Sequence, residues 1–414
     1  MGSCSKWTGR ALKIGEGTGY HRPVEEASVG VYLHVPFCER VCPYCDFAVV
    51  AARRLAADQE QAYVDALLGE LAARRDAFAG RTLASVYLGG GTPSLLTPAS
   101  LERIVAAVRA AFPAATPAEV TLEVNPGTLE RTRLPGFRQA GVGRVSLGVQ
   151  SFDDAVLKRL GRAHRGDEAR RTLAAAREAG FAELSLDLIL GAPGQGLAGL
   201  AADVDEALGF APDHVSTYEL TIEAGTPFAR AAERGQLALP DEETVLAMGE
   251  LLEARLASAG LQRYELSSYA RPGSEAVHNR RYWERAPVLG LGVGAFSTDP
   301  PSAGAPFGLR RSNTRDLAAY LARVARGASP EAGPPEPFDP ATARGEAAFL
   351  SLRTARGLDA TRFADEFGAP PRGFWAGAID ELAERGLLEE TARGDLRLSP
   401  QGRRLADLVF EHFV

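Results

Sequence analysis

The amino-acid sequence predicts an α/β fold: a partial, TIM-like (β/α)6 barrel followed by a small, winged-helix-like α+β domain. Apolar, strand-like segments alternate with amphipathic helical segments six times, about every 30 to 40 residues. The strand-like segments are apolar along most of their length, which is typical of parallel strands buried on both faces. Glycines and isolated polar residues follow the strand ends, where α/β barrels carry their sites.

Each strand of the predicted barrel is followed by a helix. The strand segments are VGVYLHVPF, LASVYLGGGTP, EVTLEVNPG, RVSLGVQSF, ELSLDLILGAP and HVSTYELTI, and the helices are expected at 58–80, 97–113, near 130–140, 167–179, 197–209 and 241–259. Thr97 is a plausible N-cap with Pro98 in the first turn, which fixes the start of the second helix. Strands that alternate with helices imply parallel pairing with right-handed crossovers.

The sequence divides the chain into five segments. Residues 1–28 form a poorly patterned N-terminal extension, 29–265 the (β/α)6 core, and 266–326 an extension of the barrel that contains HNRRYW. Residues 327–340, GASPEAGPPEPFDP, are rich in proline and predict a linker. Residues 341–414 alternate helical segments with a short β-wing, which predicts the winged-helix-like domain.

Composition excludes several classes of protein. The formal net charge of the 414-residue chain is −7, so a nucleic-acid partner is not expected. No apolar run reaches the roughly 18 residues of a membrane span, and the N-terminus lacks the apolar core of a secretory signal. We therefore expect a cytoplasmic protein without a transmembrane segment. In a reducing compartment a cluster of cysteines more often binds metal than forms disulfides.

Three of the four cysteines lie within eight residues, as C-x3-C-x2-C at Cys38, Cys42 and Cys45. Thiolates are ligands for zinc and for iron–sulfur clusters. A [4Fe–4S] cluster usually has four cysteines, so three would leave one iron open for a cofactor or substrate. Zinc completed by His34 or Cys4, and three purely structural thiols, are the alternatives. Cys4 lies in a poorly patterned segment and is not counted as a ligand.

The cysteine spacing, with Tyr44 just before the third cysteine, resembles the signature of the radical S-adenosylmethionine (SAM) superfamily. The resemblance implies that the open iron chelates the amino and carboxylate groups of SAM. It also implies that an electron from the cluster cleaves SAM to a 5'-deoxyadenosyl radical. No particular electron donor is indicated.

Further motifs narrow the resemblance. The segments YLHVPFCERVCPYCDF, LGGGTPSLL, LEVNPG, VSLGVQSFDDAVLKRLGRAH, DLILGAPGQ and HNRRYW together resemble oxygen-independent coproporphyrinogen III oxidase and its relatives, over about residues 29–410. Within that group the sequence is most similar to the HemW haem chaperones. The residues that this resemblance implies for SAM binding are Tyr32, His34, Tyr44, Gly90, Gly91, Thr92, Glu123, Gln150, Arg162 and Asp187.

Two departures separate this chain from the oxidases. The oxidase pattern has another cysteine two residues after the third, where this chain has Phe47, and a longer segment precedes its cluster. By contrast, HNRRYW matches the HNxxYW signature of the haem chaperones. The residues implied for haem binding are His278, Asn279, Tyr282 and Trp283, with Arg280 or Arg281 for the propionates. The alternative is that His278 and Trp283 only pack a domain junction.

The favoured hypothesis is a haem chaperone that carries a [4Fe–4S] cluster and SAM, binds haem and transfers it to haemoproteins. Oxidative decarboxylation of coproporphyrinogen III to protoporphyrinogen IX is the enzymatic alternative, which Phe47 disfavours. A zinc-stabilised RNA-modifying or interaction protein is a third hypothesis, against which the acidic composition counts.

Overall fold

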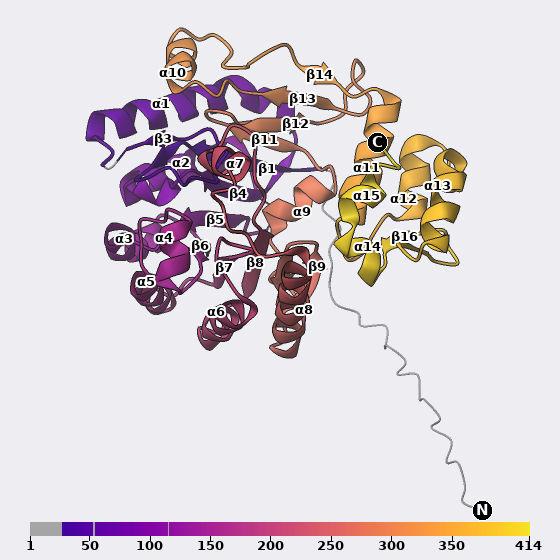
Figure 1. Ribbon diagram of the computed structural model, residues 1–414. Helices are drawn as coiled ribbons and strands as arrows, with labels where there is room; N and C mark the ends of the chain where they lie inside the picture. The colour runs from indigo at the N-terminus through magenta and orange to yellow at the C-terminus, as the bar shows by residue number, and fades with distance from the viewer. Residues whose placement is uncertain (1–26, 53, 115) are drawn as a thin grey trace, which may run out of the picture.

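The protein is built around one large mixed sheet with helices on its outer face and a separate helical domain at its C-terminal end (Figure 1). The structure is a computed structural model that describes residues 27–52, 54–114 and 116–414. The predicted N-terminal extension, 1–28, lies almost wholly outside these residues, as does Cys4. None of the helices in the described ranges is long and apolar enough to cross a membrane.

The six predicted strands form the central part of the sheet and pair in parallel, in chain order. They are β1 (Ser28–Val35), β4 (Thr82–Gly90), β5 (Glu119–Val124), β6 (Arg144–Gln150), β7 (Glu183–Leu190) and β8 (His214–Glu219). Because all six run the same way, their carboxyl ends meet at one edge of the sheet. The polar residues that follow those ends are therefore brought together, as the sequence predicts.

The sheet continues beyond the six strands on both sides. Next to β1 lie β11 (Val288–Leu291), which is parallel, and then the antiparallel strands β12 (Phe296–Asp299), β13 (Leu309–Ser312) and β14 (Glu336–Pro337). Next to β8 lie β10 (Ser268–Ala270) and β9 (Gln262–Glu265). The strand order ends at β14 and β9, so within the described residues the sheet does not close. The prediction of a partial barrel is confirmed.

Helices cover the outer face of the sheet, and all six predicted ones are present. They are α1 (Ala57–Arg74), α2 (Pro98–Ala111), α3 (Thr128–Gln139), α5 (Gly166–Glu178), α6 (Leu197–Gly209) and α8 (Glu242–Ser258). Thr97 caps α2 as expected, since its side chain accepts a hydrogen bond from the Ser100 amide and Pro98 begins the first turn.

Short elements fill the connections, and the sequence analysis did not predict most of them as separate elements. They are β2 (Phe37–Cys38), β3 (Val50–Ala51), α4 (Asp154–Arg159), α7 (Pro227–Glu233), α9 (Val277–Trp283), α10 (Leu317–Ala325), and the 3-10 turns η1 (Arg75–Phe78) and η2 (Pro93–Leu95). Two of them, β2 and α9, carry residues of the predicted site.

The core lies between the sheet and its helices. Val86 and Leu88 of β4 pack with Leu122 of β5 and with Leu101 and Ile104 of α2, and all five side chains are inaccessible to solvent. Burying each such side chain contributes about 1.5 to 3 kcal/mol. This core makes the sheet a rigid platform for the loops at its edge.

The C-terminal domain has its own core. It contains α11 (Pro340–Leu352), α12 (Ala360–Phe367), α13 (Arg372–Glu384), the hairpin of β15 (Leu388–Glu390) and β16 (Leu396–Leu398), α14 (Pro400–Arg404) and α15 (Ala406–Phe410). Phe363, Ile379, Leu382, Leu396 and Phe410 gather at its centre. These five helices and one short hairpin agree with the predicted α+β class.

Part of the segment predicted as a linker, 327–340, is attached to the barrel extension. Glu336 and Pro337 form β14 and pair with β13, and Glu331 forms an ion pair with Arg311 at 2.8 Å. A proline is tolerated at 337 because β14 is an edge strand, in which not every backbone amide has to donate a hydrogen bond. The segment is thus fastened to the barrel extension along part of its length.

Candidate cofactor site

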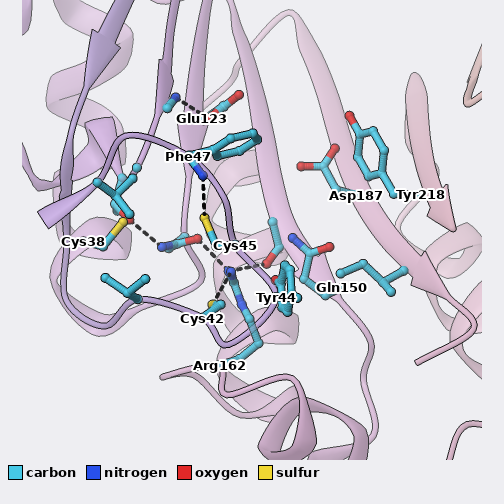
Figure 2. Close-up of a pocket in the computed structure, with 18 of the residues that line it drawn as sticks. Cys38, Cys42, Tyr44, Cys45, Phe47, Glu123, Gln150, Arg162, Asp187 and Tyr218 are labelled. Carbon is cyan, nitrogen blue, oxygen red and sulfur yellow. Dashed lines mark hydrogen bonds between the residues drawn. The ribbon is translucent and has the colours of Figure 1, made fainter. Parts of the chain in front are cut away.

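The three cysteines lie on one loop that leaves β2 and returns at β3, and Figure 2 shows this loop beside the strand ends. Pairing of Phe37 with Val50 and of Cys38 with Ala51 closes the base of the loop. A turn in which the Cys45 amide donates to the Cys42 carbonyl oxygen, at 3.1 Å, brings the other two cysteines together. We call residues 37–51 the cluster loop.

A cavity of about 330 Å³ lies between the cluster loop and the carboxyl ends of β4 to β8. All three cysteines line it. The other predicted residues that line it are Tyr44, Gly90, Gly91, Thr92, Glu123, Gln150, Arg162 and Asp187. The structure therefore gathers eleven of the thirteen residues predicted for the cluster and SAM, from six separate segments, around one space.

Arg162 connects the cluster loop to the sheet. Its guanidinium donates to the Asn125 side chain at 2.6 Å and to the Gly148 carbonyl oxygen at 3.0 Å, and it lies 3.7 Å from the Cys42 sulfur (Figure 2). Asn125 in turn donates to the Thr92 hydroxyl at 2.7 Å. Within the described residues, the buried Nε of Arg162 has no hydrogen-bond partner, which leaves one donor for a ligand.

Two glycines let the backbone of β4 approach the cluster loop. Gly90 has φ of +109°, a region that L side chains avoid. A Cβ atom on Gly91 would lie 2.9 Å from the Cys38 sulfur and 2.9 Å from two backbone carbonyl oxygens. Gly91 also donates its amide to the Val35 carbonyl oxygen at 2.8 Å. The glycine run is therefore required by close packing against the cysteine segment.

Two carboxyl groups form the inner wall of the cavity. Glu123 accepts hydrogen bonds from the Tyr87 hydroxyl at 2.9 Å and from the Gly90 amide at 3.1 Å. Burial, together with the nearby Asp187, raises the pKa of Glu123 to about 7. Burial also raises the pKa of Asp187 to about 6, although Ser146 donates to it at 3.2 Å. A cationic ligand would stabilise the ionised forms of both groups.

Gln150 ends β6 in a strained conformation. Its φ is +66°, and the pairing of β6 with β7 shifts register just before it. In the described part of the chain its buried Oε1 atom accepts no hydrogen bond. Backbone strain that aims an unpaired polar atom into a cavity is typical of ligand sites.

Tyr32 and His34 do not line the cavity, which differs from their predicted contact with SAM. His34 is buried, and its Nε2 donates to the Ala48 carbonyl oxygen at 2.9 Å while the Tyr32 hydroxyl lies 3.1 Å from Nδ1. Burial lowers the pKa of His34. Both ring nitrogens are engaged in holding the cluster loop, so His34 is not placed to complete a zinc site.

The HNRRYW motif forms α9, which packs against β4 and meets the first residue of β5. His278 has no exposed surface; its Nδ1 lies 2.9 Å from the Ser85 hydroxyl, and its Nε2 lies 3.1 Å from the Tyr282 hydroxyl. Its ring stacks on Tyr87 at 5.1 Å between centroids. Glu119 accepts hydrogen bonds from the amides of Val277 and His278.

This arrangement shows that the motif is buried in the protein, and its binding of haem stays a prediction. Both nitrogens of His278 are occupied, and burial lowers its pKa to about 3. Arg281 is equally buried and donates to Ser28 and to the Pro287 carbonyl oxygen, so it cannot reach propionates. The guanidinium of Arg353, from the end of α11, lies 4.6 Å from the Trp283 ring. The motif packs a domain junction, which was the alternative interpretation; Asn279 makes none of these contacts.

The cavity is also lined by residues that the sequence analysis did not assign to the site, among them Asn125, Ser146 and Tyr218. Asn125 follows Val124 directly at the end of β5, so its position after a strand was a usable signal. Phe47, which the sequence analysis singled out, lies at the rim of the cavity with 66% of its surface exposed.

The chain has relatives of known family. A model of the Radical SAM superfamily matches residues 32–207, and one of the HemN C-terminal domain matches residues 338–405. A Bacillus subtilis protein named "Heme chaperone HemW" is 32% identical over 384 residues, which cover 92% of this chain and 98% of the relative. A protein of the same name from Mycobacterium tuberculosis is 37% identical over 392 residues, covering 94% and 95%.

A solved structure is similar over almost the same length. Coproporphyrinogen III oxidase (HemN) from Escherichia coli, described as a radical SAM enzyme, matches with a TM-score of 0.79 and 25% identity, over 93% of this chain and 90% of that one. The fold, the cysteine loop and the relatives agree with one another. The chain belongs to the HemW haem chaperone family, within the radical S-adenosylmethionine superfamily.

Proposed function

We propose that this protein is a haem chaperone that carries a [4Fe–4S] cluster and SAM, binds haem and delivers it to haemoproteins. The observation that carries the proposal is the similarity to proteins named "Heme chaperone HemW" along nearly the whole chain, from the cluster loop to the C-terminal domain. We further propose that it acts in the cytoplasm, where thiols stay reduced, and without a nucleic-acid partner.

The cluster would be held by Cys38, Cys42 and Cys45. In a cubane cluster each thiolate binds a different iron, so the three sulfurs need not meet at a single point. In keeping with this, no three His, Cys, Asp or Glu side chains of the described residues gather closely enough for one metal ion. The fourth iron, which lacks a protein ligand, would face the cavity. When bound, the cluster supplies the electron for reductive cleavage of SAM.

The cavity fits SAM by its polar atoms. The unpaired Oε1 of Gln150 and Nε of Arg162 offer an acceptor and a donor below the surface. Gly90, Gly91 and Thr92 would lie along the methionine end, since the absence of side chains lets the ligand approach the backbone. Glu123 and Asp187 would face the cationic groups, whose charge favours the ionised carboxylates.

The oxidase is the second candidate function, because the similarity to the Escherichia coli enzyme extends over most of the chain. Phe47 argues against it. This exposed phenylalanine stands at the rim of the cavity, where the oxidase pattern has a cysteine. A phenyl ring can neither bind metal nor move a proton, so a step that needs the thiol would be lost.

The test is haem transfer by anaerobically reconstituted protein. Haem loaded on the full chain should move to an apo-haemoprotein such as apomyoglobin faster than free haem at equal concentration. A sample that binds haem without releasing it to any acceptor would contradict the chaperone proposal. A triple Cys→Ser variant of the cluster loop separates the contribution of the cluster from that of the polypeptide.

A further inference from the structure

Four rings connect the cofactor cavity with the HNRRYW motif. They belong to Tyr32 of β1, Tyr87 of β4, and His278 and Tyr282 of α9. Neighbouring rings of this group lie 5.1 to 6.2 Å apart between centroids, which is the usual range for aromatic side chains that pack together. The motif and the cavity are therefore in contact through side chains.

Tyr87 touches both sides. Its hydroxyl donates to Oε1 of Glu123 at 2.9 Å, and its ring stacks on the His278 ring at 5.1 Å with 29° between the planes. Glu123 lines the cofactor cavity, as Figure 2 shows, and its other oxygen accepts a hydrogen bond from the Gly90 amide. One side chain thus holds a proposed SAM ligand with its polar end and covers the predicted haem ligand with its face.

Gly89 leaves the space in which Tyr87 and Glu123 meet. A Cβ atom at this position would lie 2.8 Å from Cε1 of Tyr87 and 2.9 Å from Oε1 of Glu123. Both distances are shorter than van der Waals contact, so a side chain here would push the two groups apart. Gly90 and Gly91 line the cavity, whereas Gly89 does not. The hydrogen bond between Tyr87 and Glu123 therefore explains the first glycine of the run.

His278 is held in a closed arrangement. Its Nδ1 lies 2.9 Å from the Ser85 hydroxyl, its Nε2 lies 3.1 Å from the Tyr282 hydroxyl, and it has no exposed surface. The imidazole can bind an iron only after one of its nitrogens has lost its partner. A movement of α9 that exposes the imidazole must also separate it from the Tyr87 ring. The firmness with which Tyr87 is held therefore contributes to the free energy of opening.

A cationic ligand in the cavity would hold Tyr87 more firmly. Burial raises the pKa of Glu123 to about 7, so its carboxyl group is partly protonated in the empty cavity at neutral pH. The positive charge of SAM favours the ionised carboxylate, which accepts a stronger hydrogen bond from the Tyr87 hydroxyl. The Tyr87 ring then stays against His278. Bound SAM should therefore weaken haem binding at the motif, and bound haem should weaken SAM binding by the same factor.

Tyr32 extends these contacts to the cluster loop. Its ring stacks on Tyr87 at 6.1 Å, and its hydroxyl donates to Nδ1 of His34 at 3.1 Å. Nε2 of His34 in turn donates to the Ala48 carbonyl oxygen of the cluster loop at 2.9 Å. The two predicted SAM residues that do not line the cavity thus belong to the same group of contacts as Tyr87.

We propose that Tyr87 is a positioning residue that couples SAM binding in the cofactor cavity to haem binding at the HNRRYW motif, through its hydrogen bond to Glu123 and its stacking on His278. The proposal rests on the proposed haem-chaperone function and deepens it, because the coupling makes SAM binding favour the release of haem. The coupling changes only hydrogen bonds and packing, and no electron is transferred.

The test is the linkage between the two ligands in the anaerobically reconstituted full chain, without reductant so that SAM is not cleaved. Titration followed by the Soret band gives the haem dissociation constant with and without saturating SAM. In wild type, SAM should raise this constant about fivefold or more. In Tyr87→Phe, which keeps the ring but lacks the hydroxyl, the ratio of the two constants should fall below about two. Gly89→Ala, which keeps every hydroxyl but separates Tyr87 from Glu123, should lower the ratio in the same way.

Tyr320→Phe is the matched control. The Tyr320 hydroxyl is also buried and also donates to a buried carboxylate, that of Glu70, at 2.8 Å, but it lies outside the residues that line the cofactor cavity. This variant should keep the wild-type ratio. A ratio near one in wild type, an unchanged ratio in folded Tyr87→Phe, or an equal loss in Tyr320→Phe would overturn the coupling. If wild type binds no haem at all, the proposed function fails instead.

Discussion

At the scale of single residues, Arg162 is the connection on which the cofactor site depends. Its fixed guanidinium plane serves the Asn125 side chain and the Gly148 carbonyl oxygen at once and keeps one donor free. A lysine side chain has the same charge, but all its N–H donors are on one nitrogen atom, so it cannot reproduce the planar arrangement of the guanidinium donors. We therefore infer that Arg162 positions the cluster loop, in addition to its proposed contact with SAM.

Replacing Arg162 with lysine should lower SAM affinity about tenfold while the three cysteines still accept iron. Equilibrium dialysis with labelled SAM measures the affinity, and iron and sulfide analysis measures the cluster. Arg159→Lys is the matched control, because that arginine reaches only the carbonyl oxygens of Pro193 and Gly194. An unchanged SAM affinity in Arg162→Lys would contradict the assigned contact.

Glu123 makes stability depend on pH. Its carboxyl has a pKa of about 7 in the folded chain against an ordinary value of 4.5, so the folded state binds more protons between these values. The free energy of unfolding of the protein without cofactors should therefore fall as pH rises from about 4.5 to 7. In Glu123→Gln this fall should be smaller by about 2 kcal/mol.

Urea denaturation at several pH values checks this prediction. Glu102→Gln, an exposed position on α2, is the control and should follow the wild-type curve. If Glu123→Gln also follows the wild-type curve, the carboxyl does not titrate as its burial implies.

The sequence identified most residues of the cofactor site because each stands directly after a strand, and strand ends can be found from local pattern. The complete burial of His278 was not predicted, because its partners are not local. Ser85, which binds its ring, is 193 residues away in the chain, and Glu119 is 159 residues away. A seven-residue helix does not indicate by periodicity which of its polar side chains is buried.

At the scale of elements, the close contact between the end of β4 and the cluster loop is the tightest constraint. Gly91→Ala would bring a methyl group within 2.9 Å of the Cys38 sulfur and of the carbonyl oxygens of Val35 and Phe37. Backbone cannot yield as a flexible side chain does, so the cluster loop must shift. We expect reconstituted iron to fall below about half of wild type, with a cost of about 1 to 3 kcal/mol in stability.

The control for this change is Gly143→Ala, since a Cβ atom at Gly143 meets no atom within 4 Å. Iron analysis after anaerobic reconstitution, with thermal unfolding of the same samples, distinguishes loss of the cluster from loss of the fold. Full iron content in Gly91→Ala would mean that the cluster loop does not need this contact.

The α9 helix packs against Ser85 of β4 and Glu119 of β5, and His278 is buried there. Removing the His278 ring leaves the hydroxyls of Ser85 and Tyr282 without their partner in a buried place, where each costs about 1 to 3 kcal/mol. His278→Ala should therefore lose about 2 to 5 kcal/mol of stability. Urea denaturation measures this loss, and haem titration of the folded variant tests the predicted role of the motif in haem binding.

Asn279→Ala offers the comparison within the same motif, because Asn279 is only partly buried. It should leave the stability unchanged. Loss of haem binding in a folded His278→Ala protein would support ligation of haem by the motif, and a stability equal to that of wild type would contradict the role of the buried ring.

The long elements were predictable and the short ones were not. Buried parallel strands are continuous apolar runs, and α2 and α6 have clear caps or apolar faces. By contrast, β14 consists of two residues whose strand state depends on β13, and β2 and β3 pair across the cluster loop. Local sequence carries little information about such pairs, because their hydrogen-bond partners come from elsewhere in the fold.

At the scale of the whole molecule, the protein consists of the sheet with its helices and a C-terminal domain. The cluster loop and the cavity beside it belong to the carboxyl-terminal edge of the parallel strands, and the C-terminal domain has a core of its own. Figure 1 shows α9 between the sheet and that domain, next to α11. The HNRRYW motif is therefore well placed to hold the two parts together.

The central claim is that this chain carries haem and does not decarboxylate porphyrinogens. The measurement is made on one anaerobically reconstituted sample: iron and sulfide content, haem titration, and carbon dioxide release from coproporphyrinogen III with SAM and a reductant. We predict about four irons and four sulfides per chain, stoichiometric haem binding and no carbon dioxide above background. Turnover of coproporphyrinogen with release of carbon dioxide, or failure of the intact sample to bind haem, would contradict the account.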